Sequence, residues 1–544
     1  MKDIIIVRPE RCTGCNACVR VCPAPEANIT KKLDNGQIIT TVNVDKCIGC
    51  GECLKVCSHK ARDYVDDTAV FMSKIKDERM VIIVDPAIKL AYPNQWKGIL
   101  NWFKKRSYTI IDGGFGADIY VWAMMSMLDA KTVPNMISNS CSALVNYISM
   151  YHPSLIQNLP PVCSPTLCAA VYVKNYLRRS ERICVFSPCI ARKYECAETG
   201  LIDFSVTFKK LMEYFQKNDI NIPSENYADF NFDYDEKIAN IGTLNSRPGG
   251  LCDNIYNFKQ GYNIIYSSGR RRSTEQIASF TKAPTSKLPQ LLDLLACDFG
   301  CGMGPGSNPK NNCFDVIDNF KALEYEARSR ARGKVKWGDE KAFKKMDEEL
   351  EIDDFIRTYT PKRTSPNPTD ADLEPVFNDM GKTTDKQRDY NCGYCGYATC
   401  RDMAVSIYRG INTPENCIFH ILGNAKTEIK QDDEKAAKYA QINQQIAEKA
   451  KTIAENIGKV DDASSKTAEK KNTVTELLKN IIAFCNKNTS MDEASVKQMA
   501  AILETTMNSL QSFDENISEA NDGAKAVKAS IGEISELVES LKAE

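Results

Sequence analysis

Cysteines at short, repeated spacing are the residues of this chain best suited to chemistry. The chain holds 23 cysteines in 544 residues. Two runs near its start, "CTGCNACVRVCP" and "CIGCGECLKVCS", place four cysteines each at one common spacing. Thiolates are ligands for zinc and for iron–sulfur clusters. An isolated CxxC pair would favour zinc, but two runs of four at this spacing predict iron–sulfur clusters.

The two runs are similar to the doubled run of bacterial ferredoxins. In that pattern three thiolates of one loop and the fourth thiolate of the other run hold each cubane. The resemblance implies one 4Fe-4S cluster on Cys12, Cys15, Cys18 and Cys57 and a second on Cys47, Cys50, Cys53 and Cys22.

Four more cysteines lie near the other end of the chain, in "NCGYCGYATC" and "ENC". They are Cys392, Cys395, Cys400 and Cys417. Glycines between them allow the backbone to bend around a metal group. The spacing resembles the small four-cysteine modules of several anaerobic redox proteins, and it predicts a further 4Fe-4S cluster, with zinc as the alternative.

Three loops of the middle region carry the remaining candidate ligands. They are "NSCSA" with Cys141, "FSPCIARKYECAE" with Cys189 and Glu195, and "ACDFGCGMG" with Cys297 and Cys301. A lone cysteine is more often a packed core residue than a ligand. In this order after a ferredoxin-like region, however, the three loops resemble the signature loops of the iron-only hydrogenases, which read approximately TSCCP, MPCxxKxxE and MACxGGCxxGGG.

The resemblance implies a composite cofactor, the H-cluster. Cys141, Cys189, Cys297 and Cys301 would hold a cubane, which brings the number of 4Fe-4S clusters to four. Cys301 would also bridge to a diiron subsite that carries CO, cyanide and a bridging azadithiolate. In this family the subsite splits H2 into protons and electrons at an open position on iron, inside a dry pocket between two α/β lobes.

Several pocket positions depart from the family pattern. Ser140 stands where catalytic members have a cysteine that relays protons, and Ala123 and Met124 stand where acidic residues of the relay are expected. A hydroxyl has a far higher pKa than a thiol, and alanine carries no proton. The sequence therefore predicts slow turnover.

The second and third loops differ as well. Ser187 and Leu295 replace methionines, and Arg192 replaces a lysine that contacts a cyanide ligand. An arginine can donate a similar bond as a wider, rigid fork. Lys193 is an alternative donor if the loop shifts by one residue. We assign Cys301, Ser140, Arg192 and Glu195 as the candidate catalytic residues.

Three functions remain open at this stage. The first is an H2-sensing hydrogenase of low activity, in the sensory branch of the family, with H2 and protons as its reactants. The second is a working hydrogenase that exchanges electrons with ferredoxin and uses a non-standard proton route. The third is a hydrogenase-like iron–sulfur scaffold or signalling protein without the diiron subsite.

Composition and hydrophobic patterning predict the elements that position these loops. The chain is 26% charged, with a formal net charge of −1, which does not favour a nucleic-acid partner. The longest apolar stretch, residues 119–128, is too short to span a membrane, and we expect a cytoplasmic protein. Apolar runs at 80–84, 109–111, 183–186 and 263–266 predict buried strands in largely parallel sheets.

The last part of the chain has a different character. Beyond Ala425 it lacks proline and carries apolar residues at alternating steps of three and four, which predicts long helices in a coiled coil. Such helices would pair within the chain or form a homo-oligomer, and would contact a signalling protein.

The expected fold is therefore multidomain, α+β and α/β. It comprises a ferredoxin-like domain (1–75), a two-lobed H-cluster domain (76–365), a linker with a four-cysteine module (366–424) and a helical coiled coil (425–544).

Overall fold

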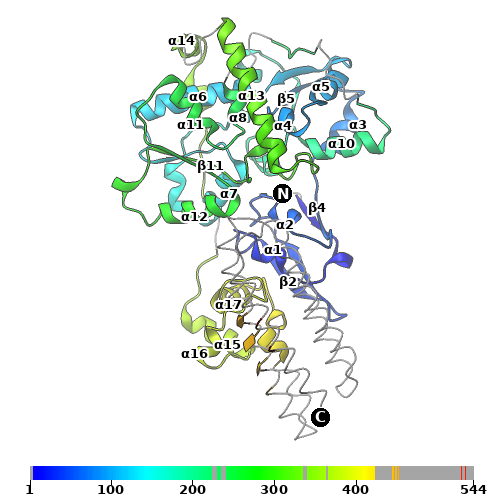
Figure 1. Ribbon diagram of the computed structural model, residues 1–544, viewed down its shortest axis with the longest axis vertical. Helices are drawn as coiled ribbons and strands as arrows, with labels where there is room; N and C mark the ends of the chain where they lie inside the picture. The colour runs from blue at the N-terminus through cyan, green and yellow to red at the C-terminus, as the bar shows by residue number, and fades with distance from the viewer. Residues whose placement is uncertain are drawn as a thin grey trace. The chain divides into compact units, whose positions relative to one another are not determined.

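The computed structural model describes residues 4–222, 230–234, 241–334, 340–362 and 365–422, together with single helical positions between 441 and 533. It forms two compact units (Figure 1). The first comprises Met1–Ile5, Ile48–Gly51 and Tyr64–Thr364, and the second comprises Ile6–Cys47, Glu52–Asp63 and Ser365–Glu544. Nearly all of the predicted coiled coil lies outside the described residues.

The first unit contains a four-stranded parallel sheet in the order β6-β5-β8-β9. Its strands are β5 (Met80–Val84), β6 (Thr109–Asp112), β8 (Arg182–Ser187) and β9 (Phe204–Thr207). Three of them lie at the apolar runs that predicted buried strands, so this part of the sequence prediction is confirmed.

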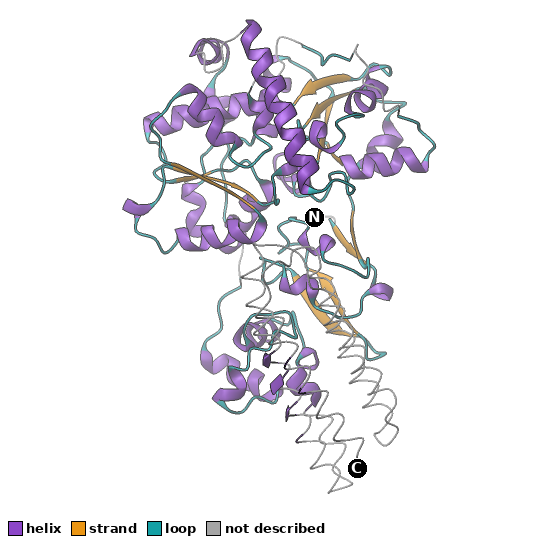
Figure 2. Ribbon diagram, viewed as in Figure 1, coloured by secondary structure: helices purple, strands orange, loops and turns teal. Residues whose placement is uncertain are grey.

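A second parallel sheet in the same unit has the order β10-β11-β7. Its strands are β7 (Met136–Ile137), β10 (Ile264–Ser268) and β11 (Leu291–Leu295), and they are drawn as arrows in Figure 2. The run at 263–266 predicted a buried strand. It forms β10, which begins one residue later, but Ile265 and Tyr266 are 45% and 54% exposed, so the prediction of burial is wrong for this edge strand. The two sheets confirm the α/β layering.

The position of β5 inside the sheet, between β6 and β8, explains why its sequence is apolar at every position. Ile82 packs in one core with Phe71, whereas the next residue, Ile83, packs in a second core with Tyr120. Successive side chains of a strand point to opposite faces, so a parallel sheet with helices on both faces needs apolar residues throughout. The helices of this unit are α3 (Thr68–Lys74), α4 (Ile88–Ala91), α5 (Trp96–Lys104), α6 (Gly114–Ala130), α7 (Ser142–Tyr151), α8 (Pro165–Val171), α9 (Arg192–Thr199), α10 (Phe208–Lys217), α11 (Gly250–Phe258), α12 (Arg270–Phe280), α13 (Cys313–Lys334) and α14 (Glu340–Glu349).

The second unit brings together residues from both ends of the chain. Its N-terminal part holds the antiparallel strands β2 (Asn28–Lys32) and β3 (Ile38–Val42), with short helices α1 (Ala17–Arg20) and α2 (Glu52–Lys55). Its C-terminal part holds α15 (Asp370–Asp379), α16 (Asp385–Arg388) and α17 (Cys400–Tyr408). A short two-stranded sheet of β1 (Ile5–Val7) and β4 (Arg62–Tyr64) has residues in both units.

Within the described part of the chain, no helix is long and apolar enough to cross a membrane.

A close helix contact in the first unit generates a stability prediction. A Cβ at Gly116 of α6 would lie 2.2 Å from the backbone oxygen of Pro165 at the start of α8. We expect Gly116→Ala to lower the free energy of unfolding by about 1–3 kcal/mol, because backbone must move to admit the methyl group. Urea denaturation measures the change.

Gly200→Asn is the control for that substitution. Gly200 has a φ of +66° and no heavy atom within 4 Å of a built Cβ, and asparagine tolerates this conformation. A loss at Gly200 as large as that at Gly116 would contradict the steric explanation.

Candidate functional site

A pocket with about 480 Å3 of empty space lies at the carboxyl ends of strands from both sheets of the first unit. Asp85 follows β5, Gly113 follows β6, Ser140 follows β7, and Leu295 ends β11. Ligand sites of parallel sheets typically form where the loops leave these ends. Arg192, Asn245, Ser246 and Cys301 complete the polar part of the lining.

The structure brings the four cysteines of the three signature loops together. Burial raises the pKa of the Cys301 thiol well above its ordinary value, and the Asp85 carboxyl and the thiols of Cys297, Cys141 and Cys189 raise it further. Burial likewise raises the pKa of Cys189 to about 11; Arg192 lowers it, and Cys141 raises it again. These thiols interact because they lie close to one another.

This set of donors fits a cationic cluster. Thiols that raise one another's pKa cannot ionise together unless a metal compensates their charge. Cys301 belongs to this set of four thiols and also lines the 480 Å3 pocket.

Arg192 and Glu195 anchor the second loop in a buried ionic network. Glu195 accepts bonds from Arg192, from Arg357 at 2.8 Å and from the Ser142 hydroxyl at 3.1 Å. Burial alone would raise the pKa of Glu195, but the two guanidinium groups hold it below its ordinary value. Glu195 therefore joins the first loop, the second loop and the segment around Arg357.

Arg192 also has a free donor at the pocket. Its Nη1 donates to the Ser164 hydroxyl at 3.2 Å and to Glu195, whereas its buried Nε has no hydrogen-bond partner among the described residues. The Oδ1 atom of Asn245, another lining residue, is also buried and unpaired there. Buried polar atoms without partners are costly, so these two atoms indicate that a polar ligand completes the pocket.

The residues that depart from the family pattern differ in whether they reach the pocket. Ser140 is 8% exposed and lines the pocket, as does Leu295. Ala123 and Met124 are fully buried in an apolar core, so neither position supplies a titratable group. Ser187 does not line the pocket and instead exchanges bonds with the backbone of Cys189 within its own loop.

Lys193 is not the alternative pocket donor that the sequence suggested. Its ammonium group forms an ion pair with Asp67 at 2.8 Å, and it does not belong to the pocket lining. The loop is held by α9, which begins at Arg192, so a shift by one residue would break the Arg192–Glu195 contact.

Asp85 is a pocket residue that sequence reasoning missed. Its Oδ1 accepts bonds from the Ser246 hydroxyl at 3.1 Å and from the backbone of Ala87 at 2.9 Å. Burial raises the pKa of its carboxyl, although these two bonds and Arg192 lower it. The signal was present in "VIIVDP", because a polar residue at the carboxyl end of a buried parallel strand is a site candidate.

The N-terminal cysteines of the second unit surround a fixed cation, Arg62. Burial raises the pKa of Cys18 to about 12; Arg62 lowers it, and Cys53, Cys15 and Cys12 raise it. Burial also raises the pKa of Cys22 to about 12, with Cys47 and Cys53 adding to the shift. Cys57 accepts a bond from the backbone of Ala61 at 3.3 Å. Cys50 belongs to the first unit and is not placed against the others.

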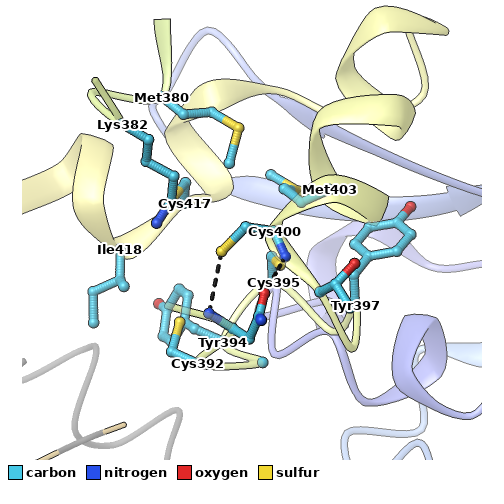
Figure 3. A pocket seen from close by; sticks show the side chains of 13 residues that line it. Met380, Lys382, Cys392, Tyr394, Cys395, Tyr397, Cys400, Met403, Cys417 and Ile418 are labelled. Carbon is cyan, nitrogen blue, oxygen red and sulfur yellow. Dashed lines mark hydrogen bonds between the residues drawn. The ribbon is translucent and has the colours of Figure 1, made fainter. Parts of the chain in front are cut away.

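The C-terminal cysteines line a pocket with about 290 Å3 of empty space (Figure 3). Burial raises the pKa of Cys395, and Cys392, Cys417 and Cys400 raise it further. The buried Lys382 lies at the same pocket and lowers the pKa of Cys392, which burial raises to about 11. Four thiols with one ammonium group form a second donor set that fits an iron–sulfur cluster.

Comparison with protein families assigns all three cysteine regions. Residues 78–305 match the iron only hydrogenase large subunit, C-terminal domain. Residues 4–58 match the 4Fe-4S dicluster domain, and residues 389–419 match the FeS model, which describes a proposed Fe-S cluster. In the comparison with curated proteins, none matches this chain.

Solved structures of hydrogenases are similar to part of the chain. One, on the stepwise assembly of the H-cluster in HydA, is 14% identical with a TM-score of 0.45, and another, on oxygen inactivation of an FeFe-hydrogenase, is 12% identical with a TM-score of 0.44. A variant of HydA1 from Chlamydomonas reinhardtii is 13% identical with a TM-score of 0.43. Each match covers 55% of this chain and 99% of the other.

The donor sets and the family matches define an iron–sulfur protein with several clusters. Residues 78–305 therefore form a domain of the iron-only hydrogenase type, between the two regions that match iron–sulfur models.

The ionic network of Glu195 generates a prediction about stability. Glu195→Ala leaves the buried guanidinium group of Arg192 without its carboxylate and Arg357 with Glu198 alone, and we expect it to lower the free energy of unfolding by about 3–5 kcal/mol. Because the pKa of Glu195 is lowered by folding, its contribution is present above the ordinary pKa of a glutamate and is lost as the pH falls through the folded value. Urea denaturation at neutral and acidic pH measures both effects.

Glu198→Ala is the matched control, because Glu198 is exposed and pairs with Arg357 at 3.1 Å and with Lys362. We expect a loss below about 1 kcal/mol there. Equal losses for the two variants would contradict the buried-network assignment.

Proposed function

We propose that this chain is an H2-sensing hydrogenase with slow turnover. It catalyses the reversible reaction of H2 to two protons and two electrons, passes electrons along its 4Fe-4S clusters and transmits the signal through its C-terminal helices to a signalling partner. The proposal includes the domain division 1–75, 76–365, 366–424 and 425–544, a ferredoxin-type redox partner and a homo-oligomer formed by the helices.

The residues would share the work as follows. Cys141, Cys189, Cys297 and Cys301 would hold the cubane, and Cys301 would also anchor the diiron group. When bound, that group supplies an open position on iron at which H2 is split. The unpaired Nε of Arg192 supports a role in orienting a polar ligand of the group, and Glu195 holds Arg192 in place. Leu295 and Pro86 help to exclude water.

The observation that carries the slow-turnover proposal is the interrupted proton path. Ser140 lines the pocket, and the predicted next members of the relay, Ala123 and Met124, are buried among apolar residues. A hydroxyl is a poor acid at neutral pH, and the two apolar residues hold no proton. Slow turnover suits a sensor, because a sensor needs occupancy of a state rather than flux.

The few described positions of the helical region support a link to the C-terminal cluster module. Lys449 forms an ion pair with Glu533, which joins two helical segments of one chain. The Lys451 ammonium group lies 5.3 Å from the centre of the Tyr390 ring, two residues before Cys392. A helix held against this module is well placed to respond to its charge.

Infrared spectroscopy of the full chain, matured with the diiron group, tests the hydrogenase assignment. We expect CO and CN stretching bands. A chain that binds its iron–sulfur clusters and shows no such bands would refute both hydrogenase functions and leave the scaffold function.

Turnover of Ser140→Cys then tests the interrupted path. We expect low wild-type turnover that rises about tenfold in the variant, because a thiol releases a proton far more readily than a hydroxyl. Ser126→Cys, on α6 outside the pocket lining, is the matched control and should leave turnover unchanged. Fast wild-type turnover with no gain from Ser140→Cys would contradict the slow-sensor proposal.

Asp85 favours a second candidate function, a working hydrogenase with a non-standard proton route. It is a carboxyl group at the same pocket as Cys301 and Ser140, and the Ser246 hydroxyl extends it by one hydrogen bond. A carboxyl with a raised pKa holds its proton to higher pH than an exposed one and can pass it to a neighbouring group.

For that candidate, Asp85→Asn should lower turnover by about 10²–10⁴-fold while the infrared bands remain, because the amide keeps the shape and loses the proton. Asp293→Asn is the matched control: Asp293 is a buried carboxyl on β11 that accepts a bond from the Ser138 hydroxyl and does not line the pocket. Unchanged turnover in Asp85→Asn would exclude this route.

A further inference from the structure

The N-terminal and C-terminal ligand loops of the second unit meet through a buried pair of amides. Asn16, between Cys15 and Cys18, donates to the side chain of Asn416 at 2.8 Å, and Asn416 is adjacent to Cys417. The reverse bond, from Asn416 to Asn16, measures 3.4 Å. The two asparagines are 2% and 1% exposed, so water does not separate them.

The backbones of the two loops are also in contact. A Cβ on Gly396 would lie 2.9 Å from the backbone oxygen of Asn16, and Gly396 has a φ of +89°. Arg20 donates to the backbone oxygen of Gly393 at 3.3 Å. Gly393 directly follows Cys392 and Gly396 directly follows Cys395, so a ligand loop of one cluster touches a ligand loop of the other.

One side chain at this contact reaches both loops. Arg20 lies between Cys18 and Cys22 in the N-terminal run, and its guanidinium group bonds Gly393, which follows Cys392. Arg20 is an exposed residue, so its charge is partly screened by solvent and salt.

A second anchor fixes the two parts independently. The buried carboxylate of Glu26 lies 3.1 Å from Lys46 and 3.2 Å from Arg409, and the Ser365 hydroxyl donates to it at 2.8 Å. The backbone of Thr30 donates to the backbone oxygen of Ile411 at 2.9 Å. These contacts hold the ligand loops together without relying on the Asn16–Asn416 pair.

We propose that this loop contact is the electron-exchange junction between the C-terminal cluster and the cluster of Cys12, Cys15, Cys18 and Cys57, and that Arg20 is a positive charge shared by both. One electron crosses the contact, so the donor cluster is oxidised by one electron and the acceptor is reduced by one. The inference rests on the cluster assignments of the proposed function, but it requires neither the diiron group nor H2. The ferredoxin-like part then has a branch that leads toward the helical region.

Magnetic coupling between the reduced clusters tests the junction. The full chain with its iron–sulfur clusters is reduced with dithionite in the absence of H2 and compared with Cys392→Ala, in which a fall in iron content verifies loss of the C-terminal cluster. In pulsed electron paramagnetic resonance we expect the N-terminal cluster signals to relax more slowly in Cys392→Ala, because their magnetic neighbour is gone. Identical relaxation in both proteins would overturn the proposal.

Potentiometric titration tests the shared charge. We expect Arg20→Gln to lower the reduction potentials of both the N-terminal signal and the C-terminal signal, since a reduced cluster is more negative and loses a nearby cation. The shift should be smaller at high salt. Arg20→Lys keeps the positive charge, so its reduction potentials should lie closer to those of the wild-type protein. Lys31→Gln removes the same charge from an exposed position on β2 and should move neither potential.

The outcomes separate this inference from the proposed function. A shift of only one signal, or equal shifts in Arg20→Gln and Lys31→Gln, would refute Arg20 as the shared charge. Coupled clusters in a chain without CO and CN bands would support the junction and refute hydrogen sensing. Uncoupled clusters in a chain with those bands would refute the junction and leave the hydrogenase assignment in place.

Discussion

Four thiols that surround one small space cannot all lose their protons unless a cation lies among them. This constraint governs the set around Cys301 and the set around Cys395, where three neighbouring thiols raise the pKa of the central one. A bound cluster removes the repulsion and draws together loops that are far apart in sequence, from Cys141 to Cys301 in the first unit. A cluster bound by these thiols would therefore stabilise the loops that line the pocket at the strand ends.

The protein supplies only part of the compensating charge, and it fixes each cation with its own atoms. Arg62 donates to Asn28 at 2.9 Å and to the backbone of Thr40 at 3.2 Å, and Lys382 donates to the backbone of Gln387 at 2.6 Å. A cation that is held in this way cannot follow the charge of the cluster as it changes. Such groups set a reduction potential rather than respond to it.

The sequence predicted what depends on local order and missed what depends on distant partners. The apolar runs of β5 and β8 are readable because strands with helices on both faces must be apolar at every position. The spacing of the ligands within a loop is also readable, because a cluster has a fixed size. Asp85 was missed because it belongs to no cysteine motif, and the ion pair of Lys193 with Asp67 joins residues 126 positions apart. The amide pair of Asn16 and Asn416 carries no sequence signal at all.

The second unit joins residues from both ends of the chain, so it can form only late in synthesis. Asn16 and Asn416 are separated by 400 positions, and Glu26 and Ser365 by 339. At a synthesis rate of roughly 5–20 residues per second, the N-terminal ligand loops wait about 20–80 s for these partners to emerge. During that interval the cysteine-rich segment is exposed to metals and oxidants, while the first unit is still being built from the segment between them. The second unit can close only after residue 416 has been synthesised, however fast its separate parts fold.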